Sequence, residues 1–173
     1  MKFFGDQDPD REPIVIQDYD PAWPAMFEEL AEPVRGALVG MNARVEHVGS
    51  TAVPGLAAKE VIDMDVVVAS PQDVPEAVER LGRLGYLHRG DLGIRGREAF
   101  AWPPGSRRHH LYVVPAGSEP FLNHLRFRDH LRSHTEDADA YAALKRLLAQ
   151  TYRTDRARYT DAKSAFIGRI LGG

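Results

Sequence analysis

The chain has 173 residues, an apolar fraction of 43% and a formal net charge of −3, which suits one domain with its own core and gives no basic field for nonspecific nucleic-acid binding. It contains no cysteine, which excludes disulfides, a thiol nucleophile and cysteine-ligated zinc. It has no apolar run of about 18 residues and no apolar N-terminal segment, so we expect a soluble, cytoplasmic protein with no membrane partner.

The spacing of apolar residues predicts the elements in chain order. A first helix follows Trp23, carries Pro24 in its first turn and continues to about Leu38. Apolar runs predict strands at residues 43–49, 61–69, 86–88, 99–102 and 109–114. Cap and proline signals predict a helix over residues 70–84, and later helices are expected at about 120–132, 136–151 and 155–171.

A strand-rich centre with helical ends predicts an α+β fold, in which helices pack on one sheet and the C-terminal part is helical. Residues 1–13 are polar and contain proline, so we interpret them as a flexible N-terminal arm. Neither an internal repeat nor a long linker divides the rest, and residues 14–173 are therefore expected to form a single domain.

Asp63 and Asp65 lie one residue apart in the most apolar predicted strand. Side chains alternate along a strand, so both carboxylates point to the same face. One interpretation is an edge strand whose carboxylates face water. We favour the other, a metal site, because two carboxylates held this close repel each other unless a cation lies between them. Oxygen ligands of this kind suit Mg²⁺ or Mn²⁺, completed by water and substrate phosphates.

A turn at Gly49, Ser50 and Thr51 ends the preceding strand, where backbone N–H groups can meet a phosphate. A Gly-Ser pair alone is a weak signal. Followed by the Asp63 and Asp65 strand, it resembles the nucleotidyltransferase fold of the DNA polymerase beta type. That resemblance implies a mixed sheet, a Gly-Ser turn that holds a triphosphate and an Asp-x-Asp strand that binds metal.

The stretch from His47 to Lys59, followed by Ile62 and Asp63, also resembles the signature of the GrpB family, of the UPF0157 type, which is found fused to some dephospho-CoA kinases. Other stretches that agree lie at residues 19–23, 84–86, 110–111, 127–132, 141–145, 159–163 and 166–167. The resemblance covers nearly the whole chain from about residue 14. It implies a nucleotidyltransferase-like fold without defining an activity.

Two positions depart from the family pattern: Glu60 replaces a common proline, and Tyr112 replaces the second histidine of a His-x-His strand. Enzymes of the polymerase beta type also use a third carboxylate on a neighbouring strand. Glu98 is the best acidic candidate for that place, and His110 could occupy it as a base or ligand. Since His109 and His110 alternate faces, we expect His110 and Tyr112 to face the ligand.

Basic residues at apolar helix positions predict a cationic wall. Arg128 lies within the apolar arc of its helix and Lys163 lies in the stripe of the last helix, where a charge must pair, extend to water or face a pocket. An ion pair is the alternative for Arg128, and extension to water is the alternative for Lys163. With Lys59, these side chains could face a phosphate while the aspartates hold the metal.

The sequence therefore predicts a protein that binds a nucleoside triphosphate or another phosphorylated small molecule. The resemblance further implies a magnesium-dependent nucleotidyltransferase that moves a nucleotidyl group to a hydroxyl acceptor, with Asp63, Asp65 and His110 in catalytic roles. The alternative is a noncatalytic accessory module that binds a phosphorylated metabolite or coenzyme and a partner enzyme. Nucleic acid is not an expected ligand, and the oligomeric state is not predicted.

Overall fold

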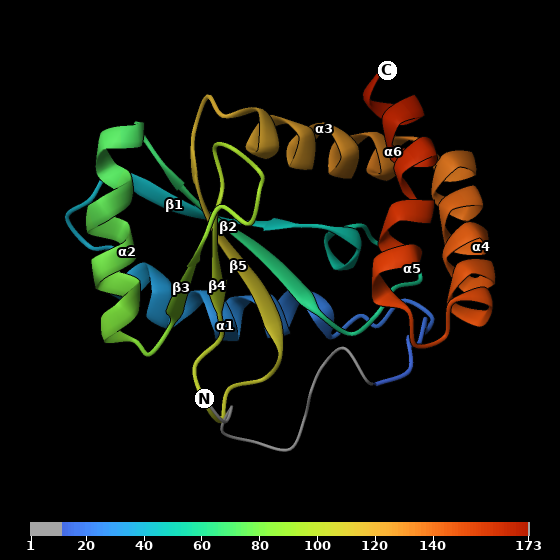
Figure 1. Ribbon diagram of the computed structural model, residues 1–173, viewed down its shortest axis with the longest axis horizontal. Coiled ribbons are helices and arrows are strands. Elements are labelled where there is room, and N and C mark those ends of the chain that lie inside the picture. Colours follow the sequence, from blue (N-terminus) through green and yellow to red (C-terminus); the bar gives the residue numbers. More distant parts are fainter. Residues whose placement is uncertain (1–11, 173) are drawn as a thin grey trace.

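Within residues 12–172, the part of the chain that the computed structural model describes, five strands form one mixed sheet in the order β1-β2-β5-β4-β3 (Figure 1). The strands are β1 (Ala43–Val48), β2 (Ile62–Val68), β3 (Leu87–Gly90), β4 (Glu98–Ala101) and β5 (His109–Pro115). β2 and β5 are parallel, and the other neighbouring strands are antiparallel. Each predicted strand is present, with its ends shifted by a few residues at most.

The helices of this part of the chain are α1 (Trp23–Ala37), α2 (Val74–Arg83), α3 (Glu119–Ser133), α4 (Thr135–Thr151), α5 (Arg156–Ala162) and α6 (Ser164–Leu171). The α+β prediction is confirmed, C-terminal helices included. The single helix expected at residues 155–171 is wrong, because the chain breaks at Lys163 into α5 and α6. None of the helices between residues 12 and 172 combines the length and the apolar character that a membrane span requires.

The two faces of the sheet have different coverings (Figure 1). α1 and α2 pack on the face that carries Met64, Val66 and Val113, where the main core lies. α3 crosses the opposite face, where Phe121 packs on Val67. Asp63 and Asp65 belong to this second face by strand alternation. The carboxylates therefore face α3 and lie on the opposite side of the sheet from the main core.

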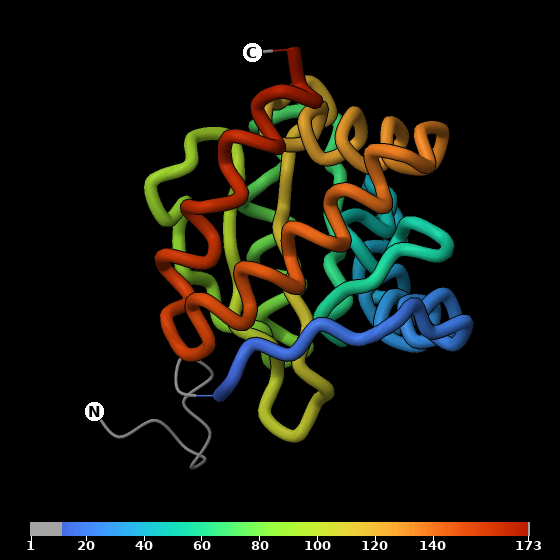
Figure 2. The backbone as a smooth tube through the Cα atoms, turned by 90° about the vertical axis from the view of Figure 1, so that its right-hand side faces the viewer, coloured from blue at the N-terminus to red at the C-terminus, as the bar shows by residue number. Residues whose placement is uncertain are grey.

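The chain that precedes α1 lies along α4 (Figure 2). The N–H of Ile14 donates to the Arg153 carbonyl at 2.8 Å, and its side chain is buried against Leu148 and Tyr159. The flexible arm predicted at residues 1–13 lies, up to residue 11, outside the described residues.

Candidate functional site

β2 is an interior strand between β1 and β5, and its carboxylates face a covered surface. The Asp65 side chain is 0% exposed and that of Asp63 is 26% exposed. The interpretation of an exposed edge strand is therefore wrong. Both carboxylates point to one face, as the strand period predicted.

The Gly49 turn lies directly against Asp63. Gly49 has φ +74°, and a Cβ added to it would lie 2.2 Å from Asp63 Oδ2. A short 3-10 helix, η1 (Ser50–Ala52), begins at the next residue. Only glycine allows both this backbone conformation and this approach, so the turn and the carboxylate form one compact unit.

Each aspartate is paired with a histidine. Asp63 Oδ1 lies 2.7 Å from Nδ1 of His110, its neighbour on β5. Burial raises the pKa of Asp63, but the hydrogen bond from His110 and the positive charges of His110 and Lys59 outweigh it, so the pKa lies below its usual value. Asp63 is therefore a carboxylate at neutral pH, as a cation or a protonated partner requires.

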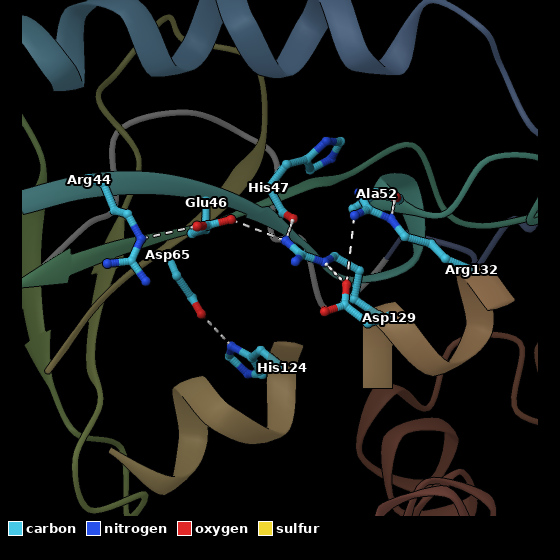
Figure 3. A network of polar contacts seen from close by, with 9 residues as sticks. Arg44, Glu46, His47, Ala52, Asp65, His124, Asp129 and Arg132 are labelled. Carbon is cyan, nitrogen blue, oxygen red and sulfur yellow. Dashed lines mark hydrogen bonds and ion pairs between the residues drawn. The ribbon is translucent and has the colours of Figure 1, made fainter. Parts of the chain in front are cut away.

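Asp65 is paired with His124 of α3, whose Nδ1 lies 2.7 Å from Asp65 Oδ2 (Figure 3). Burial raises the pKa of Asp65 above its usual value, although the His124 hydrogen bond opposes that shift. Burial lowers the pKa of His124, but the Asp65 hydrogen bond and charge dominate and raise it. The second carboxylate oxygen, Asp65 Oδ1, is buried and has no hydrogen-bond partner.

The Asp65 pair gives a prediction about stability. His124→Ala should lower the free energy of unfolding by about 3 kcal/mol, because it leaves a buried carboxylate without its partner. His88→Ala is a matched control, since His88 Nε2 lies 2.6 Å from Glu98 Oε2, a carboxylate whose side chain is 29% exposed. The control should lose less than about 1 kcal/mol. If urea unfolding shows the same loss of free energy of unfolding for both variants, the burial of Asp65 does not make its pair with His124 more important than the exposed pair of His88 and Glu98.

A buried lysine lies beneath the Gly49 turn. Lys145 of α4 is 2% exposed, and its Nζ donates to Ser50 Oγ at 3.0 Å and to the Ala57 carbonyl at 2.5 Å. Burial, together with the positive charges of Lys163 and Lys59, lowers the pKa of Lys145 to about 7. The side chain thus brings a buried, partly neutral amine to the hydroxyl of the turn.

Two further lysines flank the same place. The Nζ atoms of Lys59 and Lys163 lie 5.4 Å and 4.5 Å from the ring centroid of Tyr159, which is buried. Burial and the charge of Lys59 lower the pKa of Lys163 to about 8, and Asp63 opposes this shift. Burial also lowers the pKa of Lys59. Three buried ammonium groups are costly without an anion, and we refer to Lys59, Lys145 and Lys163 as the lysine cluster.

The structure does not bring Arg128 to the lysine cluster. Its guanidinium donates to Glu46 Oε2 at 3.2 Å, to the His47 carbonyl at 3.0 Å and to Asp129 Oδ1 at 2.8 Å. These contacts are those of the ion-pair alternative and tie α3 to the end of β1. Its expected place in the cationic wall has no support in this geometry, because its contacts are with the protein's own carboxylates.

The Thr51 hydroxyl is also engaged within the protein. Thr51 is buried, and its Oγ1 lies 2.9 Å from His47 Nε2. His47 stacks on Phe27 of α1, with ring centroids 4.5 Å apart, and burial lowers its pKa to about 4. A neutral His47 side chain thus bonds to the Thr51 hydroxyl, and this contact stabilises the turn.

The third carboxylate expected from the polymerase beta resemblance is not Glu98. Glu98 pairs with Val113 in the register of β4 and β5, which puts it on the face opposite Asp65. The residue beside Asp65 on β5 is Tyr112, and the Arg97 guanidinium lies 4.4 Å from the Tyr112 ring centroid. His110 is the residue of β5 beside Asp63, so the two aspartates have an imidazole and a phenol, and no carboxylate, beside them on β5.

Two carboxylate oxygens of the pair are not bonded to histidine: Asp63 Oδ2, beside the Gly49 turn, and Asp65 Oδ1, which is buried without a partner. A buried carboxylate oxygen is costly unless a cation or a donor meets it. This donor set therefore fits Mg²⁺ or Mn²⁺, which take one or two carboxylates together with water and phosphate oxygens. Among residues 12–172, no three His, Asp or Glu side chains are grouped closely enough to hold an ion by themselves.

Sequence reasoning missed Lys145 and His124 as site residues. Lys145 shares a buried stripe of α4 with Tyr141, Leu148 and Ala149, at helical spacing. His124 lies three residues after the buried Phe121 of α3. The signal in both was a polar residue on an apolar arc, the same signal that singled out Lys163.

Comparison with known proteins gives a family match along most of the chain. The family model described as GrpB protein matches residues 13–172. A UPF0157 protein of Pseudomonas aeruginosa is 41% identical over 167 residues, which are 94% of this chain and 68% of that protein. A dephospho-CoA kinase of Mycolicibacterium paratuberculosis is 40% identical over 79 residues, which are 44% of this chain but 19% of the kinase.

Solved structures share the arrangement of the sheet and helices. The conserved protein GrpB from Enterococcus faecalis is similar with a TM-score of 0.79 and 37% identity, over 90% of this chain and 94% of that chain. Cid1 in complex with the UTP analogue UMPNPP is similar with a TM-score of 0.53 and 14% identity, over 79% of this chain and 42% of that chain. At that identity the likeness shows the fold alone, which is nucleotidyltransferase-like.

Proposed function

This chain belongs to the GrpB family, and we propose that it binds a nucleotide or a similar phosphorylated small molecule between the Gly49 turn and the lysine cluster. The observation that carries the proposal is the lysine cluster itself. Burial lowers the pKa of all three lysines, the charge of Lys59 further lowers the pKa of Lys145 and Lys163, and Asp63 favours the charged form of each. A bound phosphate would remove their mutual repulsion and restore their protonation.

Each part of the site has a role in this proposal. Lys59 and Lys163 neutralise the phosphates, and the start of η1 with the Ser50 hydroxyl orients them. Asp63 and Asp65 would hold Mg²⁺ or Mn²⁺, which neutralises phosphate charge when bound. The two signs of charge lie on different elements around one site, and that arrangement suits a metal-phosphate complex. The likeness to the fold of Cid1, solved with a UTP analogue, supports a nucleotide as the first ligand to test.

Nucleotidyl transfer is the finer proposal for the same site. In that reaction an acceptor hydroxyl attacks the α-phosphorus of a nucleoside triphosphate and pyrophosphate leaves. His110, oriented through Nδ1 by Asp63, would take the hydroxyl proton at its other ring nitrogen. Because His110 stands where a third carboxylate is expected, binding has stronger support than turnover, and the noncatalytic alternative predicts binding without turnover.

Calorimetry with a panel of nucleotides in the presence of Mg²⁺ tests binding. We expect Lys163→Met to weaken the affinity at least tenfold, which corresponds to about 1.4 kcal/mol, because it removes a phosphate partner. Asp63→Asn should weaken it by a similar factor only when the metal is present, because its charge acts through the cation.

Arg128→Met is the matched control for these variants. Its guanidinium bonds to Glu46 and Asp129, so its removal should leave affinity within about twofold of the parent. If no nucleotide or inorganic triphosphate binds, or if Lys163→Met binds as tightly as the parent, the proposed site is wrong. Release of pyrophosphate from a bound nucleoside triphosphate would separate transfer from binding alone.

A further inference from the structure

We propose that Ser50 is a nucleophile activated by Lys145, and that its hydroxyl accepts a phosphoryl group from the phosphorylated ligand. The class of ligand rests on the proposed function, whereas the nucleophile rests on the geometry of the pair. Serine and lysine side chains in hydrogen-bond contact are a recurring catalytic pair in which the amine serves as the base.

The contacts of Lys145 are compatible with a neutral amine. Its Nζ lies 2.5 Å from the Ala57 carbonyl, which can only accept, and 3.0 Å from Ser50 Oγ, which can donate or accept. A neutral amine donates to the carbonyl and uses its one lone pair to accept the Ser50 hydroxyl proton. The charged amine donates to Ser50 Oγ; once it loses that proton, the Ala57 carbonyl still holds Nζ in place and the lone pair is free to accept from the hydroxyl.

The surroundings of Lys145 favour loss of its proton. Lys59 and Lys163 from other segments and Arg146 of the same helix oppose its charge, and Asp63 of β2 favours it. The Tyr141 ring, 4.6 Å from Nζ at its centroid, also favours the charged form. Burial outweighs the favourable contacts and brings the pKa to about 7. A substantial share of the amine is thus neutral near neutral pH.

Exposure divides the pair into a covered base and an open nucleophile. Lys145 is 2% exposed, whereas Ser50 is only partly buried and is the first residue of η1, directly after the Gly49 turn. An incoming phosphorus would therefore meet the hydroxyl and not the amine. Lys59 and Lys163, whose charges act on Lys145, would stabilise the charge that develops on the phosphoryl oxygens.

The proposed step balances without a further reactant. Ser50 Oγ forms a bond to phosphorus while the bond from phosphorus to the leaving oxygen breaks. The hydroxyl proton moves to Lys145 Nζ and stays there as an ammonium, while the leaving oxygen departs as a phosphate anion whose charge Lys59 and Lys163 offset. The products are a phosphoserine at position 50 and the dephosphorylated ligand.

An alkyl fluorophosphonate tests the nucleophile, because it offers an electrophilic phosphorus without requiring nucleotide binding. We expect intact-mass measurement to show one adduct on the parent and peptide mapping to place it on Ser50. Ser50→Ala should carry none, and Lys145→Met should react about 100-fold more slowly. Arg153→Met, which removes an exposed cation two residues after α4 that is not among the groups acting on Lys145, should react like the parent.

Several results would overturn the proposal: an unlabelled parent, an adduct on an exposed hydroxyl such as Ser164, or unchanged labelling of Lys145→Met. Circular dichroism verifies that this variant folds. If it does not, the pH dependence for the parent decides, because the labelling rate should rise through pH of about 7 and then level off. A rate that climbs without a plateau excludes Lys145 as the base. Labelling without nucleotide binding contradicts only the proposed ligand, and binding without labelling contradicts only the nucleophile.

Discussion

Raising the pH from about 7 to about 9.5 should stabilise this protein against unfolding. The folded state lowers the pKa of Lys145 from 10.5 to about 7 and that of Lys163 to about 8. Between these values and 10.5, the unfolded chain binds more protons than the folded chain, so the free energy of unfolding rises with pH. The rise is at most about 1.4 kcal/mol per pH unit for the fully buried Lys145.

Urea unfolding at a series of pH values within this window measures the effect. The window ends below pH 10, because burial raises the pKa of Tyr112 and Tyr159 to about 12 and tyrosine ionisation then favours the unfolded chain. Lys145→Met should flatten the rise, since its side chain cannot titrate. Arg153→Met, which removes an exposed cation outside the lysine cluster, should keep the slope of the parent. A parent stability that is flat or falls over this window would contradict the burial assigned to the lysine cluster.

Gly49→Ala should damage both the fold and the site. Alanine at φ +74° is strained, and its Cβ would lie 2.2 Å from Asp63 Oδ2. The carboxylate is held by His110 at 2.7 Å, so it cannot move away without losing that bond. We expect a loss of roughly 3 kcal/mol or more in urea unfolding and loss of nucleotide affinity in calorimetry.

Gly55→Ala separates the two causes, because Gly55 has φ +81° but open space where a Cβ would lie. It should lose about 1–2 kcal/mol from backbone strain alone. Adding Asp63→Ala to Gly49→Ala should recover part of the loss, since it removes the atom that clashes. If Gly49→Ala is no worse than Gly55→Ala, the close packing of turn and carboxylate is refuted.

The buried lysine cluster is unfavourable for stability, and a bound ligand would account for why the protein keeps it. Lys145 pairs with a hydroxyl and a carbonyl rather than with a carboxylate, and its amine is held in place by both. A buried amine without a carboxylate partner lowers the free energy of unfolding, and such a cost is expected at a functional site, where a bound ligand raises the stability again. The same reasoning applies to the unpartnered buried oxygen of Asp65.

Much of the site could be predicted because it is local in sequence. The period of a strand put Asp63 and Asp65 on one face, and the motif around Gly49 led to a family that the comparisons confirm. The helical period also picked out Lys163, although the chain breaks there into α5 and α6. Periodicity cannot detect a break of this kind, because the apolar spacing continues across it.

Apart from the break between α5 and α6, the sequence by itself determined where the strands and helices form, which face of β2 carries the carboxylates and that a glycine turn precedes them. Each of these depends on neighbours a few residues apart. Only the tertiary structure decided the partners. Along the sequence, Ser50 and Lys145 are 95 residues apart, and Asp65 and His124 are 59 apart. Arg128 pairs with Glu46, which is 82 residues from it in the sequence. The packing of α3 and α4 on the sheet sets those pairings, and no local pattern records how helices pack.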